Sequence, residues 1–330
     1  MKKVKGILLL IVFLFIPFLK LEALSDDSYV TWQLDRGIFA HQYKKGNDRI
    51  TNLAMMEVNG RISYCVEPGI SAQKDAMYSS TYDINDTHIG FYVVAAIVGL
   101  LVGQFVDWMN KRLPENKKIL TTDLFREYKI DFRPNYILML VTSAIYVGLV
   151  YYFGVKGSII ENLELIKNLL LVPMLLSVFV IDYNKQIIPN RLNLTMFEVG
   201  LVIAFLYGFS NVAITIDMLF GMLIGGGIFL IITLIGRLIY GKEAMGFGDV
   251  KFMAALGLYF GFVNTALISL TSFLLGAIIG IILIVFKVKK SNEYMPFGPF
   301  IVMAALICIF VPSEILLNVL KTIFTLGISK

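Results

Sequence analysis

The stretch Ser177-Val-Phe-Val-Ile-Asp-Tyr-Asn-Lys-Gln-Ile-Ile-Pro-Asn190 ends an apolar run with an aspartate, Asp182. A second stretch, Gly246-Phe-Gly-Asp-Val-Lys-Phe-Met253, begins another apolar run with Asp249. A carboxylate near the hydrocarbon layer costs roughly 2.5–3.5 kcal/mol on insertion scales, so a chain that keeps one there has a candidate functional site. Both aspartates lie at the end of an apolar run with a lysine shortly after. This shared setting predicts that they form one site.

The composition of the whole chain places these stretches in a membrane protein. The 330 residues are 57% hydrophobic and 16% charged, with a mean hydropathy of +0.76. These values exclude an ordinary soluble globular domain, and we expect an all-α polytopic membrane protein in contact with the lipid bilayer. The net charge of +5 comes from basic residues in short segments between apolar runs. That pattern is typical of cytoplasmic loops, and we expect no nucleic-acid partner.

The chain divides into three parts. Residues 1–24 have the basic start and apolar core of a secretory signal, and an uncleaved anchor helix is the alternative. Residues 25–87 are polar and aromatic, and we expect a small exported segment. Residues 88–330 form the expected membrane domain. A membrane helix takes about 20 residues, and we interpret eight apolar segments as about eight such helices: 89–108, 135–154, 166–181, 193–209, 217–240, 250–263, 265–286 and 297–311.

Two segments depart from a simple span. The segment at 250–263 is short and contains glycine, which favours a broken or re-entrant helix over a full crossing. Pro312 ends the last apolar segment, and the pattern at 313–326 predicts an amphipathic surface helix.

The basic residues predict which side of the membrane holds the aspartates. The loop 109–134 contains seven of them: Lys111, Arg112, Lys117, Lys118, Arg126, Lys129 and Arg133. This excess places the loop in the cytoplasm. Counting spans from there puts 182–192, 241–249 and 287–296 on the same side. Both aspartates are therefore expected at the cytoplasmic face of the cell membrane.

Two neighbouring carboxylates have a known chemistry. When they lie about 3 Å apart they cannot both ionise easily, so they share a proton, and the pair can activate water while polarising a carbonyl. Gly246 and Gly248 lack a β-carbon, so the backbone before Asp249 can turn tightly near a substrate. Lys251 could extend to the headgroups or bias the local field, and Pro189 is expected to end the polar extension after Asp182. Our first hypothesis is an intramembrane aspartyl protease.

Other interpretations of the same residues remain open. Each aspartate could be a solvated charge at a helix end, paired with Lys185 or Lys251. The chain could instead be a transporter or channel that uses Asp182 and Asp249 to relay protons or bind cations, or a membrane-anchored surface interaction protein. Glu198, in the span after Pro189, could line the site or pair with an interior group.

The order of motifs resembles a known family. Three segments are similar to motifs of the type IV prepilin peptidases, a GxGD aspartyl protease family: Asp182 to Asn190, Gly246-Phe-Gly-Asp-Val-Lys251 and Met295-Pro-Phe-Gly-Pro299. The first span and loop of that family are similar to Gly99-Leu-Leu-Val-Gly-Gln-Phe105 and Arg112-Leu-Pro114. The resemblance covers about 89–311. It implies Asp182 and Asp249 as the catalytic pair and prepilins or pseudopilins as substrates, cut at a basic leader on the cytoplasmic side. The substrate-binding or framework residues would be Pro189, Asn190, Gly246, Gly248, Lys251, Pro296, Phe297, Gly298 and Pro299.

The chain departs from that family in its first cytoplasmic loop. Many members carry two CxxC pairs there, which hold zinc, and also methylate the new N-terminus. Here the loop has no cysteine, and the whole chain has only Cys65 and Cys308. We therefore expect no metal and no cofactor, and we do not include methyltransferase activity in the expected function.

The exported segment has a weaker resemblance. Met55-Met-Glu-Val-Asn-Gly-Arg-Ile-Ser-Tyr-Cys-Val-Glu-Pro-Gly69 is similar to the cysteine strand of thioester domains on Gram-positive surface proteins. Such domains join the cysteine to a downstream glutamine. None of the later glutamines here lies in the Thr-Gln-x-Ala setting, so we expect a truncated remnant of that domain. Alternation at Val30 to Leu34 and Arg61 to Val66 predicts strands.

Overall fold

The computed structural model describes residues 30–34, 38–43, 51–58, 61–66, 83–84, 87–115, 134–241, 245–287 and 295–324. The N-terminal segment 1–24, interpreted above as a signal or anchor, lies outside these residues, as does most of the loop 109–134. The chain separates into two compact units, one ending at Gly90 and one beginning at Phe91. The domain boundaries at 24 and 87 stay predictions.

The first unit contains short strands. Four of them form an antiparallel sheet in the order β1-β2-β3-β4, namely β1 (Val30–Leu34), β2 (Ile38–Tyr43), β3 (Thr51–Val58) and β4 (Arg61–Val66). A separate two-stranded pair joins β5 (Asp83–Ile84) to β6 (Thr87–His88). The two strands expected from alternation coincide with β1 and β4. The export of this unit and the thioester remnant around Cys65 stay predictions.

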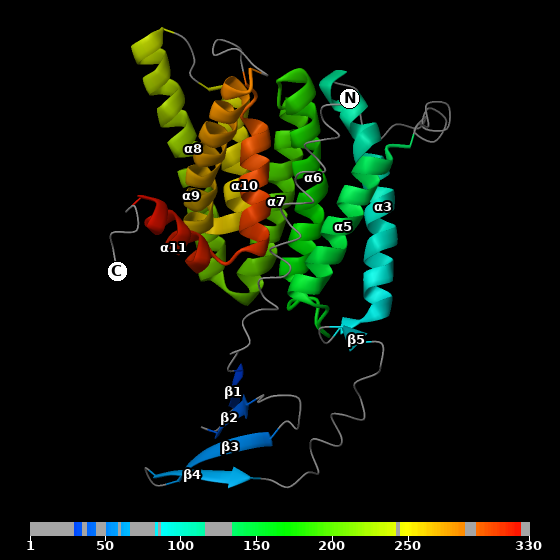
Figure 1. Ribbon diagram of the computed structural model, residues 1–330, viewed down its shortest axis with the longest axis vertical. Helices are drawn as coiled ribbons and strands as arrows, with labels where there is room; N and C mark the ends of the chain where they lie inside the picture. Colours follow the sequence, from blue (N-terminus) through cyan, green and yellow to red (C-terminus); the bar gives the residue numbers. More distant parts are fainter. Residues whose placement is uncertain are drawn as a thin grey trace. The chain divides into compact units, whose positions relative to one another are not determined.

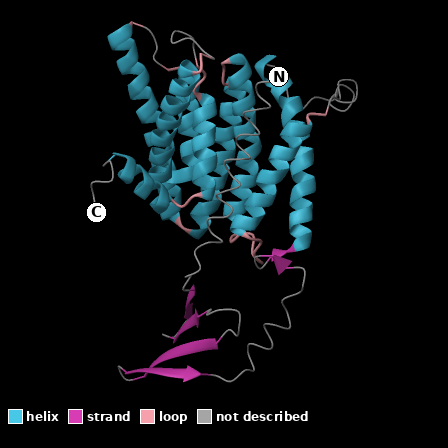
Figure 2. Cartoon of the chain, viewed as in Figure 1, coloured by secondary structure: helices cyan, strands magenta, loops and turns pink. Residues whose placement is uncertain are grey.

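The second unit is a bundle of helices (Figures 1 and 2). Its elements are α3 (Ile89–Arg112), the 3-10 turn η2 (Leu113–Glu115), α5 (Tyr136–Phe153), α6 (Leu163–Lys185), α7 (Asn190–Ser210), α8 (Val212–Tyr240), α9 (Phe247–Val285), α10 (Gly298–Phe310) and α11 (Ser313–Phe324). Six helices in the described part are long and apolar enough to cross a membrane, from α3 to α9. The predicted all-α polytopic membrane fold is confirmed. The amphipathic segment after Pro312 is α11.

The helix α6 lies at the centre of the bundle. The apolar window of α6 is 67% buried, whereas the other five spanning helices are 22–44% buried and turn a larger share of their surface outward. The shorter α10 is also largely buried and packs against both α6 and α9. The core therefore gathers around the helix that carries Asp182.

The helix α9 is a hairpin of two antiparallel halves. Gly261 interrupts it with φ 71° and ψ −176°, a non-helical conformation. On α8, Gly225 faces both Met253 and Thr265. A straight helix would hold residues 12 positions apart about 18 Å from one another, so the chain must reverse between them. The predicted segments 250–263 and 265–286 are these two halves. The two halves of α9, together with α10 and the five helices α3, α5, α6, α7 and α8, account for the eight apolar segments expected from the sequence.

Charged side chains stabilise the reversal. A helix end leaves backbone groups without intrahelical partners. Lys167 on α6 donates from Nζ to Tyr259 O at 2.9 Å, and Asp217 on α8 accepts from Phe262 N–H at 3.2 Å. A cation thus meets the carbonyls that end the first half, and an anion meets the amides that begin the second, as the helix dipoles favour. Glu164 neutralises Lys167 at 2.5 Å.

We expect Gly261→Ala to destabilise the protein. The backbone conformation of Gly261 is one that only glycine adopts readily, and holding another residue there costs about 1–3 kcal/mol. An added β-carbon would also overlap the Asp217 carboxylate. Thermal unfolding in detergent should show a Tm lower by several degrees.

Gly227→Ala is the matched control, because a β-carbon on that α8 glycine would meet nothing within 4 Å. Its Tm should equal or slightly exceed that of the wild type. Equal Tm values for the two variants would contradict the role of Gly261.

Candidate active site

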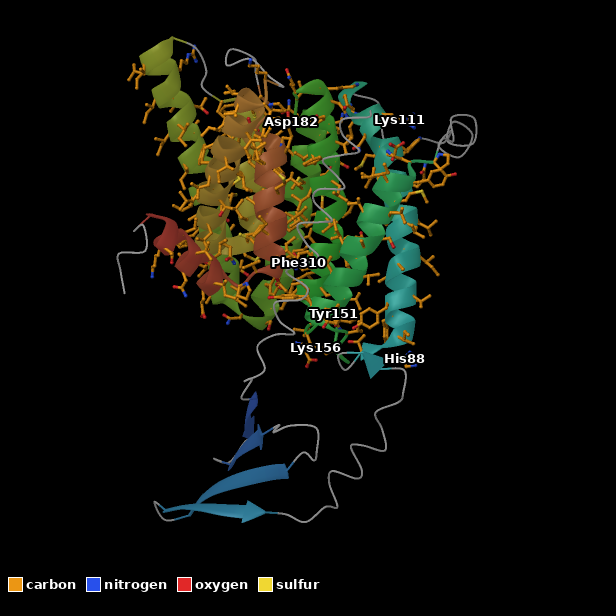
Figure 3. All side chains as sticks on the ribbon, in the orientation of Figure 1. His88, Lys111, Tyr151, Lys156, Asp182 and Phe310 are labelled. Carbon is orange, nitrogen blue, oxygen red and sulfur yellow. The ribbon has the colours of Figure 1, made fainter. Side chains whose placement is uncertain are left out.

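Asp182 lies in the last turn of the central helix. The helix α6 ends when Gln186 adopts a left-handed conformation with φ 56°, and the Gln186 N–H donates to Asp182 O at 2.8 Å. The side chain of Asp182 points inward, and the residue is only 4% exposed. Figure 3 places it at the same end of the bundle as Lys111, and Phe310 and Lys156 lie toward the other end. The carboxylate is thus at one end of the bundle but shielded from solvent.

Asp249 comes from the first turn of α9. Gly246 is the N-cap, with φ −67° and ψ 138°, and Asp249 N–H donates to Gly246 O at 3.0 Å. Asp249 is 5% exposed, and Asp182 is close enough for the two negative charges to repel. The two aspartates are 67 positions apart in sequence but form one site, because the end of α6 and the start of α9 lie at the same end of the bundle.

The interpretation as solvated helix-end charges is wrong. Both carboxylates are buried. The Lys185 side chain is exposed, and Lys251 donates to Asn190 Oδ1 at 3.0 Å instead of pairing with Asp249.

The motif before α10 supplies a hydrogen bond to the site. Gly298 is the first residue of α10, and its N–H donates to Asp182 Oδ2 at 2.9 Å. A β-carbon at Gly298 would lie 2.6 Å from the same oxygen, so the close approach requires glycine. Buried Pro296 and Pro299 flank the motif. Phe297 packs against the rings of Phe229, Phe273 and Phe300, which fixes the start of the helix.

The first turn of α7 joins the two aspartate motifs. Pro189 is the N-cap of α7, and the next residue, Asn190, accepts the bond from Lys251, which also lies over the Phe247 ring at 5.3 Å. Gly248 packs against Ile188. All the predicted framework residues therefore lie at the same end of the bundle, and their roles in catalysis stay predictions.

The structure adds one residue that the sequence interpretation missed. Asn193, one helical turn after Asn190, is 4% exposed, and its Nδ2 donates to Gly248 O at 3.2 Å. An amide on the buried face of an apolar helix was the available signal. Glu198 behaves differently from either interpretation offered for it: it is exposed on the outer face of α7 and neither lines the site nor pairs inside the bundle.

The arrangement suits acid–base chemistry by two carboxylates. Two acidic groups in a buried site can divide the roles of proton donor and acceptor between them. The described residues contain no group of three His, Cys, Asp or Glu side chains placed to hold a metal ion.

Comparisons with known proteins point to one family. Residues 169–281 match the model of the type IV leader peptidase family. The prepilin leader peptidase/N-methyltransferase of Aeromonas hydrophila is 33% identical over 141 residues, 43% of this chain and 48% of that protein. The protein of the same name from Pseudomonas aeruginosa is 33% identical over 147 residues, 44% of this chain and 50% of that protein. The chain thus spans about half the length of these relatives.

A shorter relative is covered more fully. Leader peptidase HopD of Escherichia coli is 32% identical over 131 residues, which is 39% of this chain and 82% of that protein. No solved structure matches the chain. The family match contains Asp182 and Asp249 but ends before the Pro296–Pro299 motif.

We expect the purified protein to contain no stoichiometric zinc. The chain has two cysteines and two histidines in all, too few and too scattered for a cysteine-rich site. Elemental analysis by mass spectrometry should find much less than one zinc per chain. A ratio near one that survives dialysis against a chelator would contradict this expectation.

Proposed function

The chain belongs to the type IV leader peptidase family, and on this premise we propose that it is an aspartic endopeptidase that removes basic leader peptides from type IV prepilins or pseudopilins. The observation that carries the proposal is the meeting of two buried aspartates, Asp182 and Asp249, from separate helices at one end of the bundle. Cleavage would serve pilus assembly or protein secretion. The proposal covers cleavage alone and not methylation.

The proposed mechanism divides the work between the two carboxylates. Asp182 accepts the Gly298 N–H, so it is suited to hold the negative charge and to take a proton from the attacking water. Asp249 carries the shared proton toward the carbonyl oxygen of the scissile peptide bond, which stabilises the developing charge. Burial keeps bulk water from competing for these protons.

The distribution of charge supports a cytoplasmic location for the site. The described basic residues at this end of the bundle include Lys111, Arg112, Lys185, Arg191, Lys251 and Lys287. Cytoplasmic loops carry an excess of such residues. We therefore infer that the protein is a multi-pass protein of the cytoplasmic membrane, with its active site facing the cytoplasm, where the basic leader of a prepilin lies.

The placement of the aspartates argues against transport. A coupling carboxylate in a transporter is expected near the middle of the bilayer. Asp182 is instead in the last turn of α6, and Asp249 is in the first turn of α9.

Asp182→Asn and Asp249→Asn should each abolish leader cleavage. The two carboxylates act as a unit, so loss of either should lower kcat by at least about 100-fold. The measurement is the conversion of a prepilin to its mature form by purified protein in detergent.

Asp107→Asn is the matched control. It neutralises a carboxylate on the same side of the bundle, one that bonds to Lys111 and Asn135 rather than to the dyad. It should cleave at close to the wild-type rate. If Asp249→Asn retained a tenth of wild-type activity, the dyad assignment would be wrong.

The orientation can be tested by cysteine labelling. The test uses a protein with Cys65 and Cys308 replaced by serine. Single cysteines are then introduced at exposed Ser158, which follows the Lys156 that Figure 3 labels at the end away from Asp182, and at exposed Lys287, which follows the half of α9 that returns to the Asp182 end. A membrane-impermeant maleimide should label Ser158→Cys in intact cells and Lys287→Cys only after permeabilisation. Labelling of both variants in intact cells would overturn the cytoplasmic placement.

A further inference from the structure

Asn193 makes a contact next to the catalytic motif that no other side chain makes in the described part of the chain. Its Nδ2 donates to the carbonyl oxygen of Gly248 at 3.2 Å. That carbonyl belongs to the same peptide group as the N–H of Asp249, which donates to Gly246 O at 3.0 Å. Both polar ends of the peptide group that precedes Asp249 are therefore held by hydrogen bonds.

We propose that Asn193 is a positioning residue that sets the direction of the Asp249 carboxylate. The peptide group is planar, so fixing its carbonyl and its N–H fixes the plane from which the Asp249 side chain departs. The inference rests on the proposed peptidase function, because it assigns Asn193 a role in the same site.

The backbone before Asp249 needs such a restraint. Gly246 and Gly248 both lack a β-carbon, and glycine has little intrinsic preference between backbone conformations. Gly248 is the second residue of α9, in the first turn, where a helix is held least by its own hydrogen bonds and tends to fray. Asn193 comes from α7, a helix packed against α9, so it can hold the turn from outside.

The burial of Asn193 indicates that the hydrogen bond from its Nδ2 to Gly248 O determines the orientation of its side-chain amide. Asn193 is 4% exposed, and its Oδ1 has no hydrogen-bond partner among the described residues. Rotating the amide by half a turn would set Oδ1 against the Gly248 carbonyl, two acceptors facing each other. The side chain thus keeps its donor on Gly248 and leaves its acceptor unsatisfied.

The neighbouring bond between Lys251 and Asn190 differs in kind. It joins two exposed side chains, and Lys251 donates to Asn190 rather than to the backbone next to Asp249. It ties α7 to α9 at the surface of the bundle. Among the side chains that the structure describes, Asn193 alone donates a hydrogen bond to that peptide group.

The test uses two variants of the full-length protein in detergent, with a prepilin as substrate. Asn193→Leu has a similar size and no donor. Asn193→Asp has the same shape, but its ionised carboxylate presents an acceptor to the Gly248 carbonyl. We expect both variants to lower kcat by about 10- to 100-fold, because a small misplacement of a catalytic group has effects of that size. KM should stay within about two-fold, because substrate contacts are unchanged.

Asn168→Leu is the matched control. Asn168 is an equally buried amide, 2% exposed, near the opposite end of α6. Its loss should lower the Tm but leave kcat per folded molecule within about two-fold of the wild type.

The outcomes separate the inference from the proposed function. Wild-type cleavage together with a low kcat and a near-normal KM in both Asn193 variants supports the inference. If the wild type cleaves and both Asn193 variants keep a near-normal kcat, the inference alone is overturned. The same holds if the wild type cleaves and Asn168→Leu loses as much kcat as the Asn193 variants do. A wild-type protein that cuts no prepilin overturns the proposed function and this inference with it.

Discussion

The reversal of α9 at Gly261 is the constraint on which the rest of the bundle depends. A chain that reverses between packed helices creates two helix ends whose backbone groups need partners. Lys167 and Asp217 provide them. Because the chain reverses there, the first half of α9 runs from Asp249 to the turn, and the second half returns toward the segment that carries Gly298. Without the turn, the start of α9 and the start of α10 would not lie at the same end.

The site is built from pieces that are far apart in sequence and held by different means. Asp182 accepts a backbone N–H from the first residue of α10. The turn before Asp249 is held by its own backbone and by Asn193. In both cases a helix end contacts the site. Glycine allows the approach at position 298, because a β-carbon there would lie 2.6 Å from Asp182 Oδ2, whereas a β-carbon at Gly248 would meet Ile188 at 3.4 Å, an ordinary contact distance. Gly298 is therefore explained by the space that it leaves for the Asp182 carboxylate.

Much of this arrangement follows from sequence, and the remainder depends on tertiary contacts. The hydrophobic runs predicted the helices, and the charged residues at the ends of these runs predicted Asp182 and Asp249 as site residues. Both signals can be recognised because they are local in the sequence. The reversal within α9 was indicated in the sequence only by a short apolar segment that contains glycine. The side chains that cap its two helix ends, Lys167 and Asp217, come from other helices and could not be assigned from the sequence. Asn193 was missed because an amide in an apolar helix looks the same whether it faces lipid or another backbone. Glu198 was misplaced for the same reason, since the face of α7 that packs inward depends on α8 and α9.

The burial of two carboxylates raises the question of what replaces water around them. Among the described residues, the lysines next to the two aspartate motifs do not replace it, because Lys185 is exposed and Lys251 bonds to Asn190. Two helix N-termini do. Asp249 lies within the first turn of α9, and Asp182 accepts from the first residue of α10. The N-terminus of a helix carries a partial positive charge and free N–H groups that favour an anion. This field is fixed by the backbone and brings no full positive charge to the dyad. In the proposed mechanism, this field lets the pair keep one negative charge and one shared proton, the state from which two carboxylates can activate water and protonate a carbonyl in turn.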